Sequence, residues 1–155
     1  MGPLFWDTSS FVSLVFVEPK SDLAKRSLAE AETHHAWDWM AVEAKSALGR
    51  RSASAKHHDL LDARLALMHW HTLPSELLGQ VIEKNRDWKL RAADAGHLFC
   101  FQQLYLADRK FRLISFDEEM RQAAKSNSLA VLLFSDSAWP SAWPGALSAH
   151  HVFPL

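Results

Sequence analysis

Apolar runs that stop at a carboxylate are the clearest feature of this chain. Residues 4–6 read Leu-Phe-Trp and are followed at once by Asp7, and the run over 112–116 is followed by Asp117. Short apolar runs of this kind are typical of strands buried in a parallel sheet. Two further runs predict strands, over 34–37 and 129–134.

Between these strands, apolar residues recur at helical spacing. The spacing predicts helices over 11–17, 21–32, 39–48, 56–71, 74–82, 88–107 and 118–125. The run over 11–17 is also rich in β-branched residues, but a strand there would block the end of the strand over 4–6. Strands that alternate with helices imply an α/β fold with a mostly parallel central sheet flanked by helices. We therefore expect a single domain over 1–134.

The segment 135–155 has a different pattern. It contains the tetrapeptide Ser-Ala-Trp-Pro twice, at 137–140 and at 141–144. A residue that precedes proline is biased away from helical backbone angles. We expect a C-terminal extended tail that packs on its own domain or on a partner.

Two further acids fall on helical faces that the pattern turns inward. Glu43 lies three residues after Met40 and four before Ala47, and Asp94 lies on the apolar stripe of the helix expected over 88–107. A charge on such a face costs several kcal/mol unless it is paired or bound to a metal. Both acids therefore need a partner.

The carboxyl ends of parallel strands form the functional edge of an open α/β sheet. We expect Asp7 and Asp117 to meet Glu43 and Asp94 there. Taken singly, the two strand-end acids could be helix N-caps, and either helical acid could pair with a buried arginine such as Arg91. Gathered acids repel by about 4 kcal/mol per pair at 4 Å and a dielectric of 20, so a cluster needs a cation. A cluster of carboxylates without thiolates suits Mg²⁺ or Mn²⁺.

Composition narrows the class of protein. The chain has 155 residues, of which 48% are hydrophobic, and a net charge of −1. One cysteine, Cys100, excludes an internal disulfide, and no apolar run approaches the ~20 residues of a membrane span, so a cytoplasmic protein without a membrane segment is expected. Without a global basic field, a polyanion must be held by a metal or by local clusters of cations. Three clusters are candidates, around 45–56, 86–91 and 109–112.

Other chemistries lack a motif. The nine histidines include no His-Glu-x-x-His pair, and neither a Gly-x-Gly-x-x-Gly stretch nor a P-loop is present. His97 is expected to be a hydrogen-bonded core residue and Cys100 a small core hydrophobe.

Four stretches together resemble a known family. They are 6–12 (Trp-Asp-Thr-Ser-Ser-Phe-Val), 42–48 (Val-Glu-Ala-Lys-Ser-Ala-Leu), 90–98 (Leu-Arg-Ala-Ala-Asp-Ala-Gly-His-Leu) and 114–124 (Ile-Ser-Phe-Asp-Glu-Glu-Met-Arg-Gln-Ala-Ala). In order and spacing they are similar to the PIN-domain nucleases, in particular the VapC-type toxins of toxin–antitoxin pairs. The resemblance implies a PIN-like parallel-sheet fold, metal-dependent cleavage of RNA, a homodimer and a small cognate antitoxin.

The resemblance also assigns residues. It makes three acids metal ligands, namely Asp7, Asp94 and Asp117. Glu43 would complete the acidic cluster, while Thr8 or Ser9 would hold a carboxylate or the attacking water. Two positions depart from the family pattern: Gly96 stands where a larger apolar residue is usual, and Asn127 stands where a glycine often ends the helix.

The resulting expectation is a Mg²⁺- or Mn²⁺-dependent endoribonuclease, the toxin of a type II toxin–antitoxin system. The alternative is a partner-binding or metal-sensing scaffold with the same fold and no significant cleavage. A metal-dependent phosphatase is a weaker alternative, because Ser9 occupies the place where such an enzyme usually has a second acid two residues after its nucleophilic aspartate.

Overall fold

A parallel sheet forms the centre of the protein. The computed structural model describes residues 1–132. Within them the sheet has four strands in the order β3-β2-β1-β4, and every pairing is parallel. The strands are β1 (Leu4–Trp6), β2 (His34–Trp37), β3 (Met68–His71) and β4 (Arg112–Ile114).

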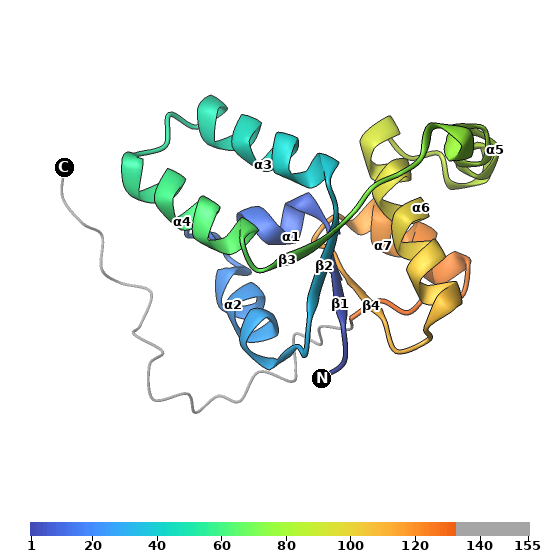
Figure 1. Ribbon diagram of the computed structural model, residues 1–155, viewed down its shortest axis with the longest axis horizontal. Coiled ribbons are helices and arrows are strands. Elements are labelled where there is room, and N and C mark those ends of the chain that lie inside the picture. Colours follow the sequence, from blue (N-terminus) through green and yellow to red (C-terminus); the bar gives the residue numbers. More distant parts are fainter. Residues whose placement is uncertain (133–155) are drawn as a thin grey trace.

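Helices cover both faces of this sheet. They are α1 (Thr8–Val12), α2 (Ser21–Glu30), α3 (Trp39–Arg50), α4 (Ala55–Leu65), the 3-10 helix η1 (Ser75–Leu77), α5 (Leu78–Trp88), α6 (Ala92–Ala107) and α7 (Glu118–Ser126). Figure 1 shows α1 to α4 on one side and α5 to α7 on the other. Alternate residues of β1 supply the two cores: Leu4 and Trp6 pack with the first group and Phe5 with the second. The expected α/β fold is confirmed.

The topology brings two strand ends together at the functional edge. β1 is a central strand, with β2 and then β3 on one side of it and β4 on the other. The chain therefore adds strands first on one side of β1 and then on the other, and the order of the strands changes direction between β1 and β4. The backbone N–H of Asp7 donates to the carbonyl of Ile114 at 3.1 Å, which holds the two carboxyl ends in register. This is the switch point at which open α/β sheets bind ligands.

The strand expected over 112–116 ends at Ile114, and three expected helices differ more clearly from the structure. The helix expected over 56–71 ends at Leu65, and the last four residues form strand β3 against β2. The helix expected over 88–107 is broken at Lys89, which has a left-handed backbone with φ of 56°. The helix expected over 11–17 stops at Val12. At β3, hydrogen bonds to β2 outweigh a local preference for helix, which sequence periodicity cannot register.

The predictions for the C-terminal residues can be compared with the structure up to residue 132. Of the strand expected over 129–134, the described residues show one parallel bridge between Val131 and Leu113. Residues 133–134 and the expected tail over 135–155 lie outside the described residues. Within the described residues, no helix is long and apolar enough to cross a membrane.

Gly96 departs from the family pattern for a reason of packing. A Cβ at Gly96 would lie 2.6 Å from Cη2 of Trp37, a distance that side-chain carbons do not adopt. The indole of Trp37 therefore occupies the space that a larger residue at position 96 would fill. The glycine of α6 and the tryptophan of β2 complement each other.

Candidate active site

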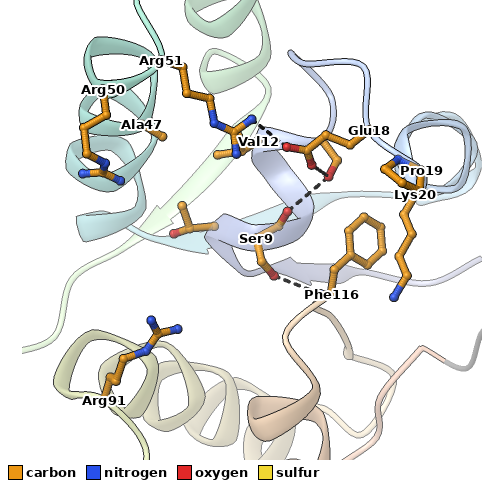
Figure 2. Close-up of a pocket in the computed structure, with 12 residues that line it drawn as sticks. Ser9, Val12, Glu18, Pro19, Lys20, Ala47, Arg50, Arg51, Arg91 and Phe116 are labelled. Atoms are coloured by element: carbon orange, nitrogen blue, oxygen red, sulfur yellow. Dashed lines mark hydrogen bonds and ion pairs between the residues drawn. The ribbon is translucent and has the colours of Figure 1, made fainter.

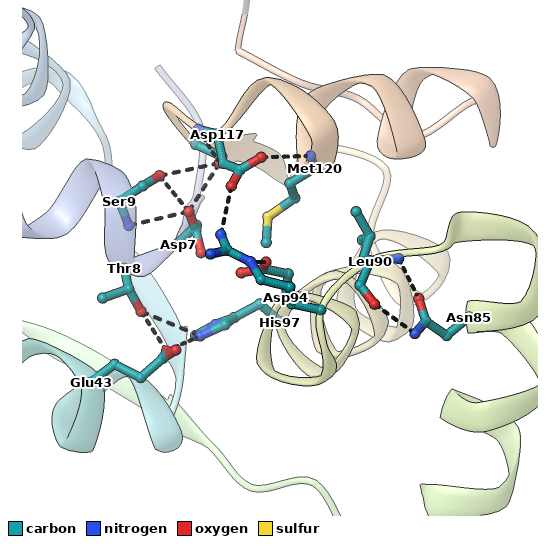
Figure 3. A network of polar contacts seen from close by, with 12 residues as sticks. Asp7, Thr8, Ser9, Glu43, Asn85, Leu90, Asp94, His97, Asp117 and Met120 are labelled. Atoms are coloured by element: carbon teal, nitrogen blue, oxygen red, sulfur yellow. Dashed lines mark hydrogen bonds and ion pairs between the residues drawn. The ribbon is translucent and has the colours of Figure 1, made fainter.

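Asp7 is buried at the carboxyl end of β1 and is held by neighbouring hydroxyls. Only 2% of its surface is exposed. Its Oδ2 accepts hydrogen bonds from the Ser9 hydroxyl at 2.5 Å, the Ser9 backbone N–H at 3.2 Å and the Ser115 hydroxyl at 2.9 Å. Asp7 is thus the N-cap of α1, as one reading of the sequence suggested, and it also faces the other acids (Figure 3). Three donors to one oxygen fix the orientation of the carboxylate.

The carboxylate of Glu43, on the inward face of α3, is stabilised by Thr8 and His97. Its Oε2 accepts a hydrogen bond from the Thr8 hydroxyl at 2.6 Å and lies 2.5 Å from Nε2 of His97 (Figure 3). Burial would raise the pKa of Glu43, but the hydrogen bonds from His97 and Thr8 outweigh it and the pKa is lowered. Burial would lower the pKa of His97, yet Glu43 and the charges of Asp7 and Asp94 raise it overall. The expectation that His97 is a hydrogen-bonded core residue is confirmed.

Asp94 and Asp117 share one guanidinium. Nε of Arg91 donates to Oδ2 of Asp94 at 2.9 Å, and its Nη2 donates to Oδ2 of Asp117 at 3.2 Å. Burial and the negative charges of Asp7 and Asp117 raise the pKa of Asp94 against the hydrogen bond from Arg91. Asp117 also caps α7 by accepting from the N–H of Met120 at 3.0 Å. The side chain of Arg91 remains 77% exposed, so it reaches the acids from the solvent side.

The break at Lys89 changes how Asp94 is positioned. Because α6 begins at Ala92, Asp94 lies in the first turn of that helix rather than in the middle of a long apolar stripe. The exposed backbone N–H groups of a helix N-terminus favour negative charge there. The sequence placed Asp94 among the acids correctly, although the expected helix was too long.

The four acids suit a hard metal ion. Asp7, Asp94 and Asp117 point towards a common region, with Glu43 beyond Thr8 (Figure 3). The donors are carboxylate oxygens, which Mg²⁺ and Mn²⁺ prefer, and two of the other acids, Asp7 and Asp117, are close enough to raise the pKa of Asp94. In residues 1–132 no group of three acid, histidine or cysteine side chains is arranged to hold an ion. The hydroxyls, His97 and Arg91 engage the carboxylates instead.

One contributor to this site, Ser115, escaped the sequence analysis. His97 was expected as a hydrogen-bonded core residue but not as the partner of Glu43. Arg91 was considered as a buried partner of Glu43 or Asp94, whereas it pairs with Asp94 from the solvent side. The signal for Ser115 was its position at the end of β4, two residues before Asp117. Its hydroxyl also accepts the backbone N–H of Asp117 at 3.1 Å, so it connects the two strand-end acids.

The chain is similar to known proteins in sequence and in fold. No family model matches the chain. Over 145 residues it is 32% identical to Ribonuclease VapC46 of Mycobacterium tuberculosis, a match that covers 85% of this chain and 98% of the relative. Its fold is similar to that of M. tuberculosis VapC20, described as a sarcin-ricin loop cleaving toxin. That match has a TM-score of 0.58 and 19% identity and covers 77% of this chain and 94% of the other. A sequence identity of 32% over 98% of Ribonuclease VapC46 shows that the chain belongs to the VapC family of PIN-domain toxins.

Proposed function

We propose that this protein is a metal-dependent endoribonuclease and the toxin of a toxin–antitoxin pair. The observation that carries the proposal is the meeting of Asp7, Asp94 and Asp117 at the switch point of the sheet. Family membership supports RNA as the substrate, since the 32% identical relative is named a ribonuclease. A small antitoxin and a second copy of the chain are the proposed protein partners.

The three strand-end and helix-end acids would hold Mg²⁺ or Mn²⁺. When bound, the ion would acidify a water and neutralise charge on the phosphate oxygens in the transition state. The chain's own contribution is orientation: Ser9 and Ser115 fix the Asp7 carboxylate, and Thr8 fixes that of Glu43. These hydroxyls limit the rotation of the carboxylates, so less entropy is lost when a ligand is bound.

Glu43 and His97 form a partly buried polar pair beside the three proposed metal ligands. The 2.5 Å contact between Oε2 of Glu43 and Nε2 of His97 is buried on the histidine side. It keeps Glu43 ionised, and Thr8 and His97 hold its carboxylate in place. A bound ion would lower the pKa of a water, so no protein general base would be required.

The decisive experiment is cleavage of a structured RNA pool by purified protein. Wild type should cut the RNA with Mn²⁺ or Mg²⁺ and not with EDTA, while Asp94→Asn should be inactive under all three conditions. Cutting that EDTA and Asp94→Asn leave unchanged would contradict the proposed site. If the wild type binds Mn²⁺ in a calorimetric titration but leaves RNA intact, the alternative of a metal-sensing or partner-binding scaffold is favoured.

A further inference from the structure

A basic cavity adjoins the acidic cluster. Its volume is about 610 Å³, and it lies between α1, the turn at 13–20 and the end of α3 (Figure 2). Three residues line it that also belong to the acidic site or contact it, namely Thr8, Ser9 and Arg91. A ligand bound at the acids can therefore extend directly into this cavity.

The walls of the cavity carry an excess of positive charge. Four cations line it against one acid, Glu18: they are Lys20, Arg50, Arg51 and Arg91. The whole chain has a net charge of −1, so this excess is local. Figure 2 shows Arg91 on one side of the space, with Arg50 and Arg51 on the opposite side. Such an arrangement attracts a phosphate-bearing ligand.

Arg51 is fixed in place. Its Nη1 donates to Oε1 of Glu18 at 2.6 Å, and its guanidinium lies 4.4 Å from the ring centroid of Phe16. Ser13 donates to the other oxygen of Glu18 at 2.6 Å. Burial would raise the pKa of Glu18, but the bonds from Ser13 and Arg51 lower it, so the acid stays charged and the pair neutralises itself.

Lys20 and Arg50 are the cations left for a ligand. Both are exposed, and within residues 1–132 neither forms an ion pair. Nζ of Lys20 lies 5.3 Å from the ring centroid of Phe116, and the backbone N–H of Phe116 donates to Ser9 at 2.9 Å. The backbone at Phe116 is thus connected to the Asp7 carboxylate through the Ser9 hydroxyl. Cations beside an aromatic face are the usual components of a site for single-stranded nucleic acid.

We propose that this cavity binds the nucleotide next to the scissile phosphodiester of an RNA strand. Lys20 and Arg50 contact its phosphate, and Phe116 presents a face on which its base stacks. The proposal rests on the proposed ribonuclease function and adds the direction in which the strand leaves the acids. An acidic peptide would use the cations equally well, but it would have no need of the aromatic face or of the connection to Asp7 through Ser9.

The first test measures how RNA affinity depends on salt. The probe is a short fluorescein-labelled single-stranded RNA, bound in EDTA so that it is not cleaved, and the readout is anisotropy. Each phosphate contact adds about 0.7 to the slope of log K against log salt, so Lys20→Gln/Arg50→Gln should lower the slope by about 1.4. The charge-conserving Lys20→Arg/Arg50→Lys should keep the slope of wild type. The matched control is Arg86→Gln on α5, an exposed arginine paired with Glu83, which should not change it.

The second test concerns stacking. Phe116→Leu keeps an apolar side chain and removes the ring, and it should weaken RNA binding by about 5- to 150-fold, the usual effect of losing one stacked base. Circular dichroism and thermal unfolding identify a variant that has failed to fold. If Phe116→Leu does not fold, Phe116→Tyr replaces it in the test, because this variant retains the ring and should bind RNA like wild type. If Phe116→Tyr bound RNA as weakly as the folded Lys20→Gln/Arg50→Gln variant, the stacking role would be overturned.

The subsite and the nuclease can fail separately. An unchanged salt slope in Lys20→Gln/Arg50→Gln overturns the subsite even where the wild type cleaves RNA with Mn²⁺. A slope lowered as expected supports the subsite, and it does so even where wild type and Asp94→Asn are equally inactive, an outcome that would refute the nuclease. A slope lowered equally by Arg86→Gln overturns the subsite, because it would show a non-specific effect of charge.

Discussion

Arg91 acts as an internal cation at the scale of single residues. Its guanidinium bridges Asp94 and Asp117, the acids that are proposed to bind the metal. A divalent ion must displace these contacts, so the arginine competes with the ion for the same oxygens. In the absence of the ion it relieves the repulsion between two carboxylates, which explains how the acids can lie so close together.

Removing that competitor should strengthen metal binding. Arg91→Gln is expected to lower the dissociation constant for Mn²⁺ by about 2- to 10-fold, a modest factor because exposed ion pairs are individually weak. Isothermal titration calorimetry at low salt measures it, with Arg86→Gln as the control that removes an equal charge elsewhere. A dissociation constant that is unchanged or higher in Arg91→Gln would show that Arg91 does not oppose the ion.

Two of the acids differ in what they contribute to the fold. Asp7 accepts three hydrogen bonds from Ser9 and Ser115, whereas Asp94 accepts one from an exposed arginine and its pKa is raised by burial. Asp7→Asn should therefore lower the free energy of unfolding by about 1–3 kcal/mol, while Asp94→Asn should change it by less than about 0.5 kcal/mol. Urea unfolding in EDTA makes the comparison. A larger loss in Asp94→Asn would mean that its pair with Arg91 is structural.

At the scale of elements, α6 and β2 meet through a glycine. Gly96→Ala would place a methyl group against the indole of Trp37, which also packs edge-on against His97 with ring centroids 5.1 Å apart. Alanine favours a helix over glycine by about 1 kcal/mol, but overpacking costs about 1–3 kcal/mol, so a net loss of up to about 2 kcal/mol is expected.

Thermal unfolding with tryptophan fluorescence measures this change. The matched control is Gly49→Ala in α3, where an added Cβ meets nothing within 4 Å and the variant should gain up to about 1 kcal/mol. Combining Gly96→Ala with Trp37→Leu should recover part of the loss by freeing the space. Equal gains at both glycines would show that the indole moves aside without cost.

The pairing of β2 with β3 gathers histidines on one face of the sheet. Nδ1 of His35 lies 2.9 Å from Nε2 of His71, and the His35 ring stacks on that of His69 at 4.9 Å. Burial, and after it the charges of His71, His69 and His34, lower the pKa of His35 to about 4. The pKa of His71 is also lowered, chiefly by burial. In the folded protein, therefore, these rings stay neutral to lower pH than in the unfolded chain.

Acid should consequently weaken the fold before the carboxylates titrate. An unfolded histidine binds its proton near pH 6.5, so the unfolded state gains protons between about pH 6.5 and 4 that folded His35 does not. The free energy of unfolding should fall by about 1–3 kcal/mol across that window, allowing for partial exposure of the rings. Urea midpoints at several pH values test this. His35→Gln should flatten the dependence and His58→Gln, exposed on α4, should not; identical curves for the two variants would exclude the cluster as the cause.

At the scale of the whole molecule, the sequence was sufficient for three of the four described strands and for the approach of Asp7, Asp94 and Asp117 at one edge of the sheet (Figure 3). Both follow from local signals, namely an apolar run that stops at Asp7 and at Asp117. The error at β3 has a different origin, because Met68 suits a helical stripe and a strand equally and only its pairing with β2 decides. The long-range contacts of the acids could not be predicted either, since Arg91 reaches Asp117 and His97 reaches Glu43 across 26 and 54 residues.

The proposed metal site should make the stability of the whole molecule depend on metal. An ion held by the acids in the folded state alone would neutralise their charges, and at 100 times its dissociation constant it would add about 2.7 kcal/mol to the free energy of unfolding. For a chain of this length the melting temperature should rise by about 5–10 °C with Mn²⁺, and EDTA should reverse the rise. Differential scanning fluorimetry measures it beside Asp94→Asn, which lacks one proposed ligand and should respond much less. A rise of equal size in both proteins would place the ion elsewhere, whereas a rise confined to wild type would assign it to the acids even before an RNA target is known.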